Sequence, residues 1–184
     1  PYYNDLLSWG AITGGFCRDS KGIYWRTTKF NGLGLTRFRD ADIYPEGGAG
    51  KKQPFNVLFK DVIIKTSYLD EENGYYYMFV QKAAGVKPGI YRIALSKLQN
   101  ADGSDVEGNA DLTIADCQLI DDSPVYMDGN EDSGEICNIA QINGDGTNIY
   151  WSYIAAPSDD KAIKGSVALD ANNPLHKSGI KTIK

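Results

Sequence analysis

Short apolar runs separated by turn residues dominate the pattern of hydrophobic and polar positions along the chain. The clearest runs span residues 61–68, 75–80, 89–95 and 149–154. They are rich in β-branched and aromatic residues and are bounded by Gly, Pro, Asn and Asp, a composition typical of strands and turns. The best helix candidates, residues 4–9 and 94–100, are too short to build a helical core. The pattern therefore predicts an all-β protein.

Three segments of the chain repeat one layout. Each begins with a strand, followed by a tight turn that contains Gly with Asp or Asn and by a second strand that starts with aromatic residues. A loop then leads to a third strand that begins with glycine, at 34–38, 89–93 or 165–169. A fourth strand is expected at 54–59, 112–117 and 178–183. With Tyr24, Tyr76 and Tyr150 as equivalent markers, the spacings are 52 and 74 residues. We place the repeats at about 11–60, 61–120 and 135–184.

A repeat of about 40–50 residues that contains four antiparallel strands is typical of a β-propeller blade. The segments 19–25, 73–77 and 145–151 resemble blades of TolB-like propellers, which have six to eight blades, and 89–93 resembles the third strand of such a blade. The resemblance implies that residues 1–184 are one β-propeller portion with three visible blades. Because propellers close with four or more blades, we expect a larger propeller, completed by other chain segments or protein subunits. A sandwich is the alternative fold.

The acidity of the chain is concentrated in one segment. The formal net charge is −5, yet 11 of the 24 acidic residues lie between residues 99 and 135, an interval without Lys or Arg. The remaining chain has 13 acids against 19 bases, a net charge of +6. We interpret residues 99–135 as an acidic insert. The chain has neither a basic stripe with a nucleic-acid motif nor an apolar run of the about 18 residues that a membrane span needs, so we expect neither partner.

The acidic insert contains a candidate calcium site. Oxygen ligands occupy alternating positions on a Gly-containing turn, at Asp128, Asn130, Asp132 and Glu135. Calcium takes six to eight oxygen ligands in flexible geometry, although the spacing is not that of an EF-hand. A second, looser group comprises Asp102, Ser104, Asp105 and Glu107. The alternative for both groups is a solvated loop with Asx turns.

Aromatic side chains are the candidate ligand-binding residues. They alternate with small or polar residues along the expected strands: Trp25, Tyr76, Tyr91, Trp151 and Tyr153. Exposed Trp and Tyr suit stacking on sugars or peptides. The alternative is packing between sheets, which we favour for Trp25 and Trp151 because we place them at equivalent positions of their repeats.

Catalytic chemistry has few candidates. Glycosidases use two carboxyl groups as acid and base or nucleophile, and the inner-strand acids are Asp19, Asp70 and Glu135. An aspartate before a hairpin usually closes the turn instead. His176 is the only histidine and lies in an expected polar turn, so a catalytic triad or two-histidine zinc site is not supported.

The three cysteines, Cys17, Cys117 and Cys137, lack metal or redox spacing. Each sits in a strand-like context, as small buried hydrophobic residues do. A Cys117–Cys137 disulfide is one option in an oxidising compartment.

We therefore expect a non-enzymatic binding module that recognises a glycan or peptide through loops at one face of the propeller. The chain also resembles propeller-bearing surface lipoproteins of Bacteroidota that accompany outer-membrane nutrient importers. That resemblance implies the extracellular face of the outer membrane or the periplasm, with membrane attachment only through a lipid anchor outside this sequence. The alternative is a fragment of a glycan-cleaving propeller enzyme.

Overall fold

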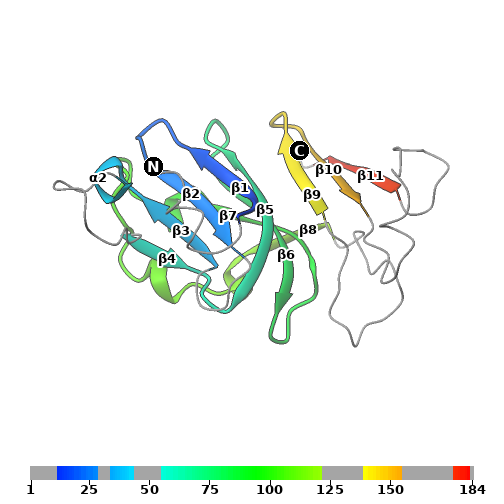
Figure 1. The fold of residues 1–184 in the computed structure, drawn as a ribbon, viewed down its shortest axis with the longest axis horizontal. Coiled ribbons are helices and arrows are strands. Elements are labelled where there is room, and N and C mark those ends of the chain that lie inside the picture. Colours follow the sequence, from blue (N-terminus) through cyan, green and yellow to red (C-terminus); the bar gives the residue numbers. More distant parts are fainter. Residues whose placement is uncertain (1–11, 29–33, 44–54, 122–138, 155–175, 183–184) are drawn as a thin grey trace.

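A computed structural model describes residues 12–28, 34–43, 55–121, 139–154 and 176–182. Nearly all of the regular structure in these ranges is antiparallel β-sheet, with one short helix and three 3₁₀ turns. Three sheets form, each from strands that are consecutive in the chain (Figure 1). The all-β prediction is confirmed.

The first sheet is a four-stranded meander. It contains β1 (Ile12–Arg18), β2 (Tyr24–Thr28), β3 (Leu35–Phe38) and β4 (Asn56–Leu58) in that order. The helix α2 (Asp40–Ile43) follows β3. β4 lies within the predicted fourth strand, residues 54–59.

The second sheet is also a four-stranded meander: β5 (Val62–Asp70), β6 (Tyr75–Ala83), β7 (Gly89–Ala94) and β8 (Gln118–Asp121). Three 3₁₀ turns connect β7 to β8, namely η1 (Leu95–Lys97), η2 (Asn109–Asp111) and η3 (Ile114–Asp116). The predicted fourth strand at 112–117 is therefore wrong. A capping box explains the difference, because the Asp116 carboxylate accepts hydrogen bonds from the Thr113 amide and hydroxyl and closes a 3₁₀ turn there.

The third sheet has three strands among the described residues: β9 (Ile139–Gly144), β10 (Asn148–Ile154) and β11 (His176–Thr182). β11 pairs directly with β10, so the segment expected as the fourth strand occupies the third position. The strand expected at 165–169 lies outside the described residues. His176 opens β11 opposite Ile154 and does not lie in a turn.

The first strands of the three sheets lie side by side. β5 contacts both β1 and β9, and the later strands of the first and third sheets fan away to either side (Figure 1). The second sheet is thus covered on both faces. One face contributes Tyr76, Met78 and Val80 to a core shared with the first sheet. The other contributes Tyr77 and Phe79 to a core shared with the third sheet.

Two glycines allow the first strands to approach one another. A Cβ atom at Gly15 of β1 would collide with Ser67 Oγ of β5 and would lie 2.6 Å from Thr27 Oγ1 of β2. A Cβ atom at Gly144 of β9 would lie 2.6 Å from Tyr68 Cε1 of β5. Strand glycines commonly mark such close approaches. The inter-sheet spacing here depends on them.

Replacing Gly15 by alanine is expected to destabilise the protein by about 1–3 kcal/mol, since the methyl group overpacks a filled interface. Urea unfolding measures the change. Ser67→Ala removes the nearest obstructing atom, so adding it to Gly15→Ala should recover part of the loss. Unchanged stability of the single variant would contradict the close approach.

Strand pairing also corrects the alignment of the repeats. Trp25 pairs with Cys17, Tyr77 with Tyr68, and Tyr150 with Asn143. In each pair the second residue named belongs to the first strand of the hairpin and lies two residues before the aspartate of that hairpin. The equivalent of Trp25 in the third sheet is therefore Tyr150, and the prediction that Trp25 and Trp151 are equivalent is wrong. The hairpin loops differ in length, and a one-residue shift moves a side chain to the opposite face of a sheet.

Candidate functional site

Asp19 follows β1 and has both carboxylate oxygens engaged by its own hairpin and a neighbouring connection. Oδ1 accepts hydrogen bonds from the amides of Lys21 and Ile23, at 3.0 and 2.8 Å. Oδ2 accepts from Trp25 Nε1 at 2.9 Å and from Gln99 Nε2 at 3.2 Å. With an exposed fraction of 2%, Asp19 holds the hairpin closed and offers no free oxygen to a substrate.

The other two hairpins use aspartate in the same way. Asp70 accepts hydrogen bonds from the amide and side chain of Asn73. Asp145 accepts from the amides of Thr147 and Asn148 and from the Tyr150 hydroxyl. These bonds lower the pKa of Asp145, the Tyr150 bond contributing most. Of the catalytic candidates, Glu135 lies outside the described residues, and the two that are described close turns.

Four of the five aromatic residues singled out from the sequence lie in the cores between the sheets. Trp25 and Tyr76 are fully buried and stack on each other with ring centroids 5.3 Å apart. Tyr91 belongs to the same core, and Trp151 packs on the other face of the second sheet. None of these four rings has an exposed face on which a sugar can stack. Tyr153 is a β10 residue whose side chain lies outside the described part of the structure.

The described part of the acidic segment, residues 99–121, docks onto the first sheet and contributes β8 to the second. Most hydrogen bonds of this contact are made by Arg37 of β3, whose side chain is fully buried. Its guanidinium donates to Asp105 Oδ1 at 2.7 Å and to Gln99 Oε1 at 2.6 Å. It also donates to the carbonyl oxygens of Leu98 and Gly103. We call this set the Arg37 latch.

Aromatic rings complete the surroundings of Arg37. The guanidinium carbon lies 4.5 Å from the ring centroid of Trp25 and 5.0 Å from that of Phe55. Burial lowers the pKa of the guanidinium, and the nearby carboxylates, Asp105 foremost, oppose that shift. The latch therefore joins the first sheet to the β7–β8 connection through a buried charge that is hydrogen-bonded and stacked.

The calcium candidates Asp128, Asn130, Asp132 and Glu135 lie outside the described residues. Of the second group, Asp105 pairs with Arg37 and Asp102 accepts hydrogen bonds from Ser104. Within the described ranges, no group of three or more His, Cys, Asp or Glu side chains is arranged to hold a metal ion.

Cys17 and Cys117 are free thiols in partly buried positions. The Cys117–Cys137 disulfide stays a prediction, because only one of its two residues is described. Cys137 lies outside the described residues. Burial raises the pKa of both described thiols from 9.0 to about 12, with smaller contributions from Asp19 and Glu71 for Cys17 and from Asp116 for Cys117. Such thiols are poor nucleophiles because the thiolate is the reactive form.

Alkylation of Cys17 and Cys117 in the folded protein is therefore expected to be about 50-fold or more slower than that of a free thiol at about pH 8. The measurement uses a Cys137→Ser background, iodoacetamide and mass spectrometry, with the urea-unfolded protein as the fast reference. Equal rates in the folded and unfolded protein would contradict the burial of these thiols.

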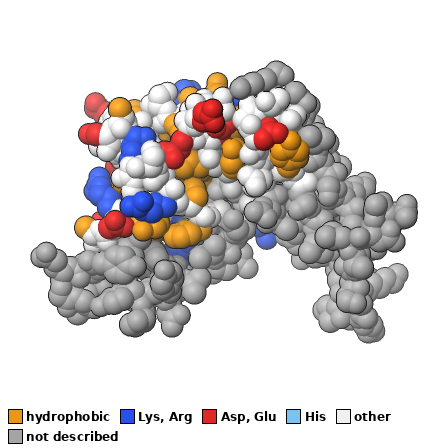
Figure 2. Space-filling model, turned by 90° about the horizontal axis from the view of Figure 1, so that it is seen from above, with side chains coloured by type: hydrophobic (Ala, Val, Ile, Leu, Met, Phe, Trp, Pro, Cys, Tyr) orange, Lys and Arg blue, Asp and Glu red, His pale blue; other side chains and the backbone are white. Residues whose placement is uncertain are grey.

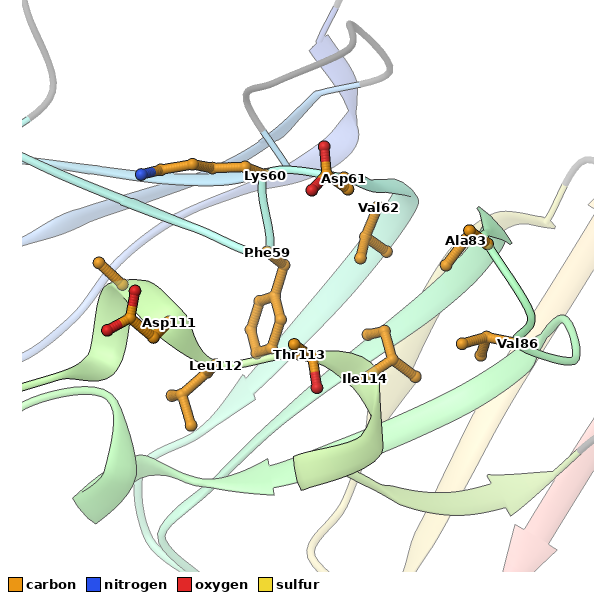
Figure 3. Close-up of a pocket in the computed structure, with 12 residues that line it drawn as sticks. Phe59, Lys60, Asp61, Val62, Ala83, Val86, Asp111, Leu112, Thr113 and Ile114 are labelled. Carbon is orange, nitrogen blue, oxygen red and sulfur yellow. The ribbon is translucent and has the colours of Figure 1, made fainter.

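A pocket of about 390 Å³ lies at the end of the first two sheets opposite the β5–β6 hairpin. Three connections form it: the turn from β4 to β5, the β6–β7 hairpin, and the segment spanning η2 and η3 (Figure 3). Its lining consists of Phe59, Lys60, Asp61, Val62, Ala83, Ala84, Val86, Ala110, Asp111, Leu112, Thr113 and Ile114. We call it the Phe59 pocket.

The Phe59 pocket has an apolar interior and a charged rim. Phe59, Val62 and Ile114 are almost fully buried parts of the adjoining core. In Figure 3 the Phe59 ring points from the β4–β5 turn toward Leu112 and Thr113. Lys60, Asp61 and Asp111 are exposed. The pocket can therefore take an apolar group while charges of both signs meet the surrounding part of a ligand.

Phe59 also has an unusual backbone. It is the only non-glycine residue with a left-handed φ, 52°, among the described residues. The conformation closes the turn, in which the Val62 amide donates to the Phe59 carbonyl at 3.1 Å. Strained residues of this kind cluster at ligand sites. Sequence reasoning missed this site because its three walls are far apart in the chain and none has a motif.

A second, more polar hollow of about 490 Å³ lies at the opposite end of the first sheet, between Arg18, Lys21, Arg39, Asp40 and Asp102. Charges of both signs line it, and Arg18 contacts Asp40 at 3.7 Å. Figure 2 shows the molecule from above, where described Lys and Arg side chains lie among Asp and Glu side chains. Because charges of both signs line this hollow, it favours neither an anionic nor a cationic ligand.

The described residues contain no helix long and apolar enough to cross a membrane. A scan against models of known protein families finds no match to this chain, and a comparison with curated proteins finds no relative. The geometry of the chain itself is therefore the basis for a functional proposal.

Proposed function

We propose that the chain is part of a β-propeller and serves as a non-enzymatic binding module, with the Phe59 pocket as its binding site. The observation that carries the proposal is that pocket, because three inter-strand connections converge on an apolar interior with a charged rim. Loops held by a rigid sheet scaffold are where binding sites concentrate. We expect a glycan or peptide ligand.

The propeller proposal is supported by the three consecutive meanders with neighbouring first strands. It is also supported by the burial of three residues that strand pairing makes equivalent. Trp25 of the first sheet is covered by the second sheet and Tyr77 of the second by the third, whereas Tyr150 of the third sheet is 40% exposed. A further sheet next to Tyr150 would complete the pattern, from another chain segment or subunit. Intact mass and light scattering of the source protein test this, and a stable 20.2 kDa monomer would contradict it.

The extracellular or periplasmic location and the lipid anchor outside this sequence are proposed from the lipoprotein resemblance alone. Labelling of intact cells with a membrane-impermeant reagent tests the location. Labelling that first appears after osmotic shock would place the protein in the periplasm. Labelling that first appears after full disruption of the cells would contradict both locations.

The non-enzymatic part of the proposal is supported by Asp19 and Asp70, whose oxygens are occupied by their hairpins. No observation favours the glycan-cleaving alternative. Incubation with aryl glycosides is expected to release no phenol above buffer. Release that disappears in a Glu135→Gln variant would overturn the proposal and support the enzyme.

Binding at the Phe59 pocket is tested by replacing either of two alanines in the β7–β8 connection with tryptophan. Ala110 and Ala115 are both exposed residues of 3₁₀ turns, and Ala110 lines the pocket whereas Ala115 is not among its lining residues. We expect Ala110→Trp to weaken binding of small ligand probes by about tenfold or more, and Ala115→Trp to leave it unchanged. Equal effects of the two variants would place binding elsewhere.

A further inference from the structure

We propose that the Phe59 pocket binds the apolar side chain of a peptide in preference to a sugar. The inference rests on the proposed binding function and names the ligand class. It starts from the interior of the pocket, where Ala83, Val86 and Leu112 are partly exposed and present apolar surface. They pack over a core that includes the almost fully buried Phe59, Val62 and Ile114.

An apolar interior disfavours a sugar ring. Each sugar hydroxyl that enters the pocket loses water and needs a hydrogen-bond partner to compensate. Phe59 is the only aromatic residue in the lining, and its exposed fraction is 1%, so it offers no open ring face for stacking. The hydroxyl of Thr113 is already bonded to Asp116.

The size of the pocket fits a side chain. Its volume of about 390 Å³ is near the lower end of the range of about 300–1,000 Å³ for small-ligand sites. A leucine or phenylalanine side chain with the adjoining backbone fits such a space.

The rim suits a peptide backbone and a basic neighbour. Lys60 offers an ammonium group to a peptide carbonyl, while the carboxylates of Asp61 and Asp111 accept hydrogen bonds from peptide amides. With two carboxylates against one ammonium group, the rim has a net charge of −1. A lysine beside the apolar residue of the ligand is therefore favoured over a glutamate.

The test is an amide-resolved NMR titration of the full chain with N-acetyl-leucinamide and, separately, methyl β-glucoside and decanoate. We expect saturable shifts at residues 59–62, 83–86 and 110–114 with N-acetyl-leucinamide only, weakened about tenfold or more by Ala110→Trp and unchanged by Ala115→Trp. Saturable pocket shifts with the glucoside or decanoate alone would overturn the peptide proposal and leave the binding function standing. No pocket shifts with any probe would overturn both.

The charge of the rim is tested with two dipeptides. N-acetyl-Leu-Lys-amide is expected to bind about threefold or more tighter than N-acetyl-Leu-Glu-amide at low ionic strength. Asp111→Asn should reduce this preference, whereas Glu107→Gln, which changes an exposed carboxylate of the same connection that does not line the pocket, should leave it intact. Equal binding of the two dipeptides, or equal effects of the two variants, would overturn the assigned role of the rim.

Discussion

Replacing Arg37 by methionine is expected to lower the free energy of unfolding by about 3–5 kcal/mol, measured by urea denaturation. Methionine keeps much of the side-chain volume but removes every hydrogen bond of the Arg37 latch. Gln99 and the carbonyl oxygens of Leu98 and Gly103 then lose a donor inside the protein, and unsatisfied buried acceptors are costly. Asp105 contributes less, because its side chain is 37% exposed.

Arg18→Met is the matched control. Arg18 also faces an aspartate, Asp40, but at 3.7 Å and with both side chains more than half exposed. Exposed ion pairs contribute about 0–1 kcal/mol, so the control should lose little. If both arginine variants lose the same stability, the latch is not a stabilising element of the fold.

Replacing Trp25 by alanine is expected to cost about 3–5 kcal/mol of stability, as large-to-small changes in a filled core do. The substitution removes a fully buried ring that stacks on Tyr76, supports Arg37 and donates to Asp19. The measurement is again urea unfolding, with binding of N-acetyl-leucinamide at low temperature as a second readout. Because Trp25 does not line the Phe59 pocket, the folded fraction should bind the probe normally.

Leu119→Ala provides the comparison for Trp25→Ala. Leu119 is a β8 residue that is 41% exposed, so its truncation should cost less than about 1 kcal/mol. A Trp25 variant that stays as stable as this control yet loses ligand binding would reverse the assignment and make Trp25 a ligand contact.

The pattern of apolar runs was sufficient to predict the strands on either side of the three hairpins, because strand propensity and turn residues are local signals. Asp19, Asp70 and Asp145 each mark a hairpin, and the strands around them form as expected. The face that each aromatic occupies was not predictable to the same degree. The hairpin loops differ in length, so Trp25 and Trp151 approach the second sheet from opposite sides.

The segment between β7 and β8 shows where local reasoning ends. Its acidic composition indicates a solvated loop, but Asp105 and Gln99 have long-range partners in Arg37 and Asp19. Nothing near Arg37 in the sequence identifies it as a buried cation. The Phe59 pocket was missed for the same reason, because residues 59–62, 83–86 and 110–114 converge only after the two sheets pack.

The Arg37 latch has a consequence for how the chain opens. Residues 98–105 are part of the connection between two strands of the second sheet, yet they accept hydrogen bonds from Arg37 of the first sheet. The two sheets therefore cannot separate without exposing a buried guanidinium. Native-state hydrogen exchange should therefore find the amides of β3 and β7 in one cooperative unit with a common opening free energy. The third sheet, which has no part in the latch, is free to exchange through smaller openings of its own.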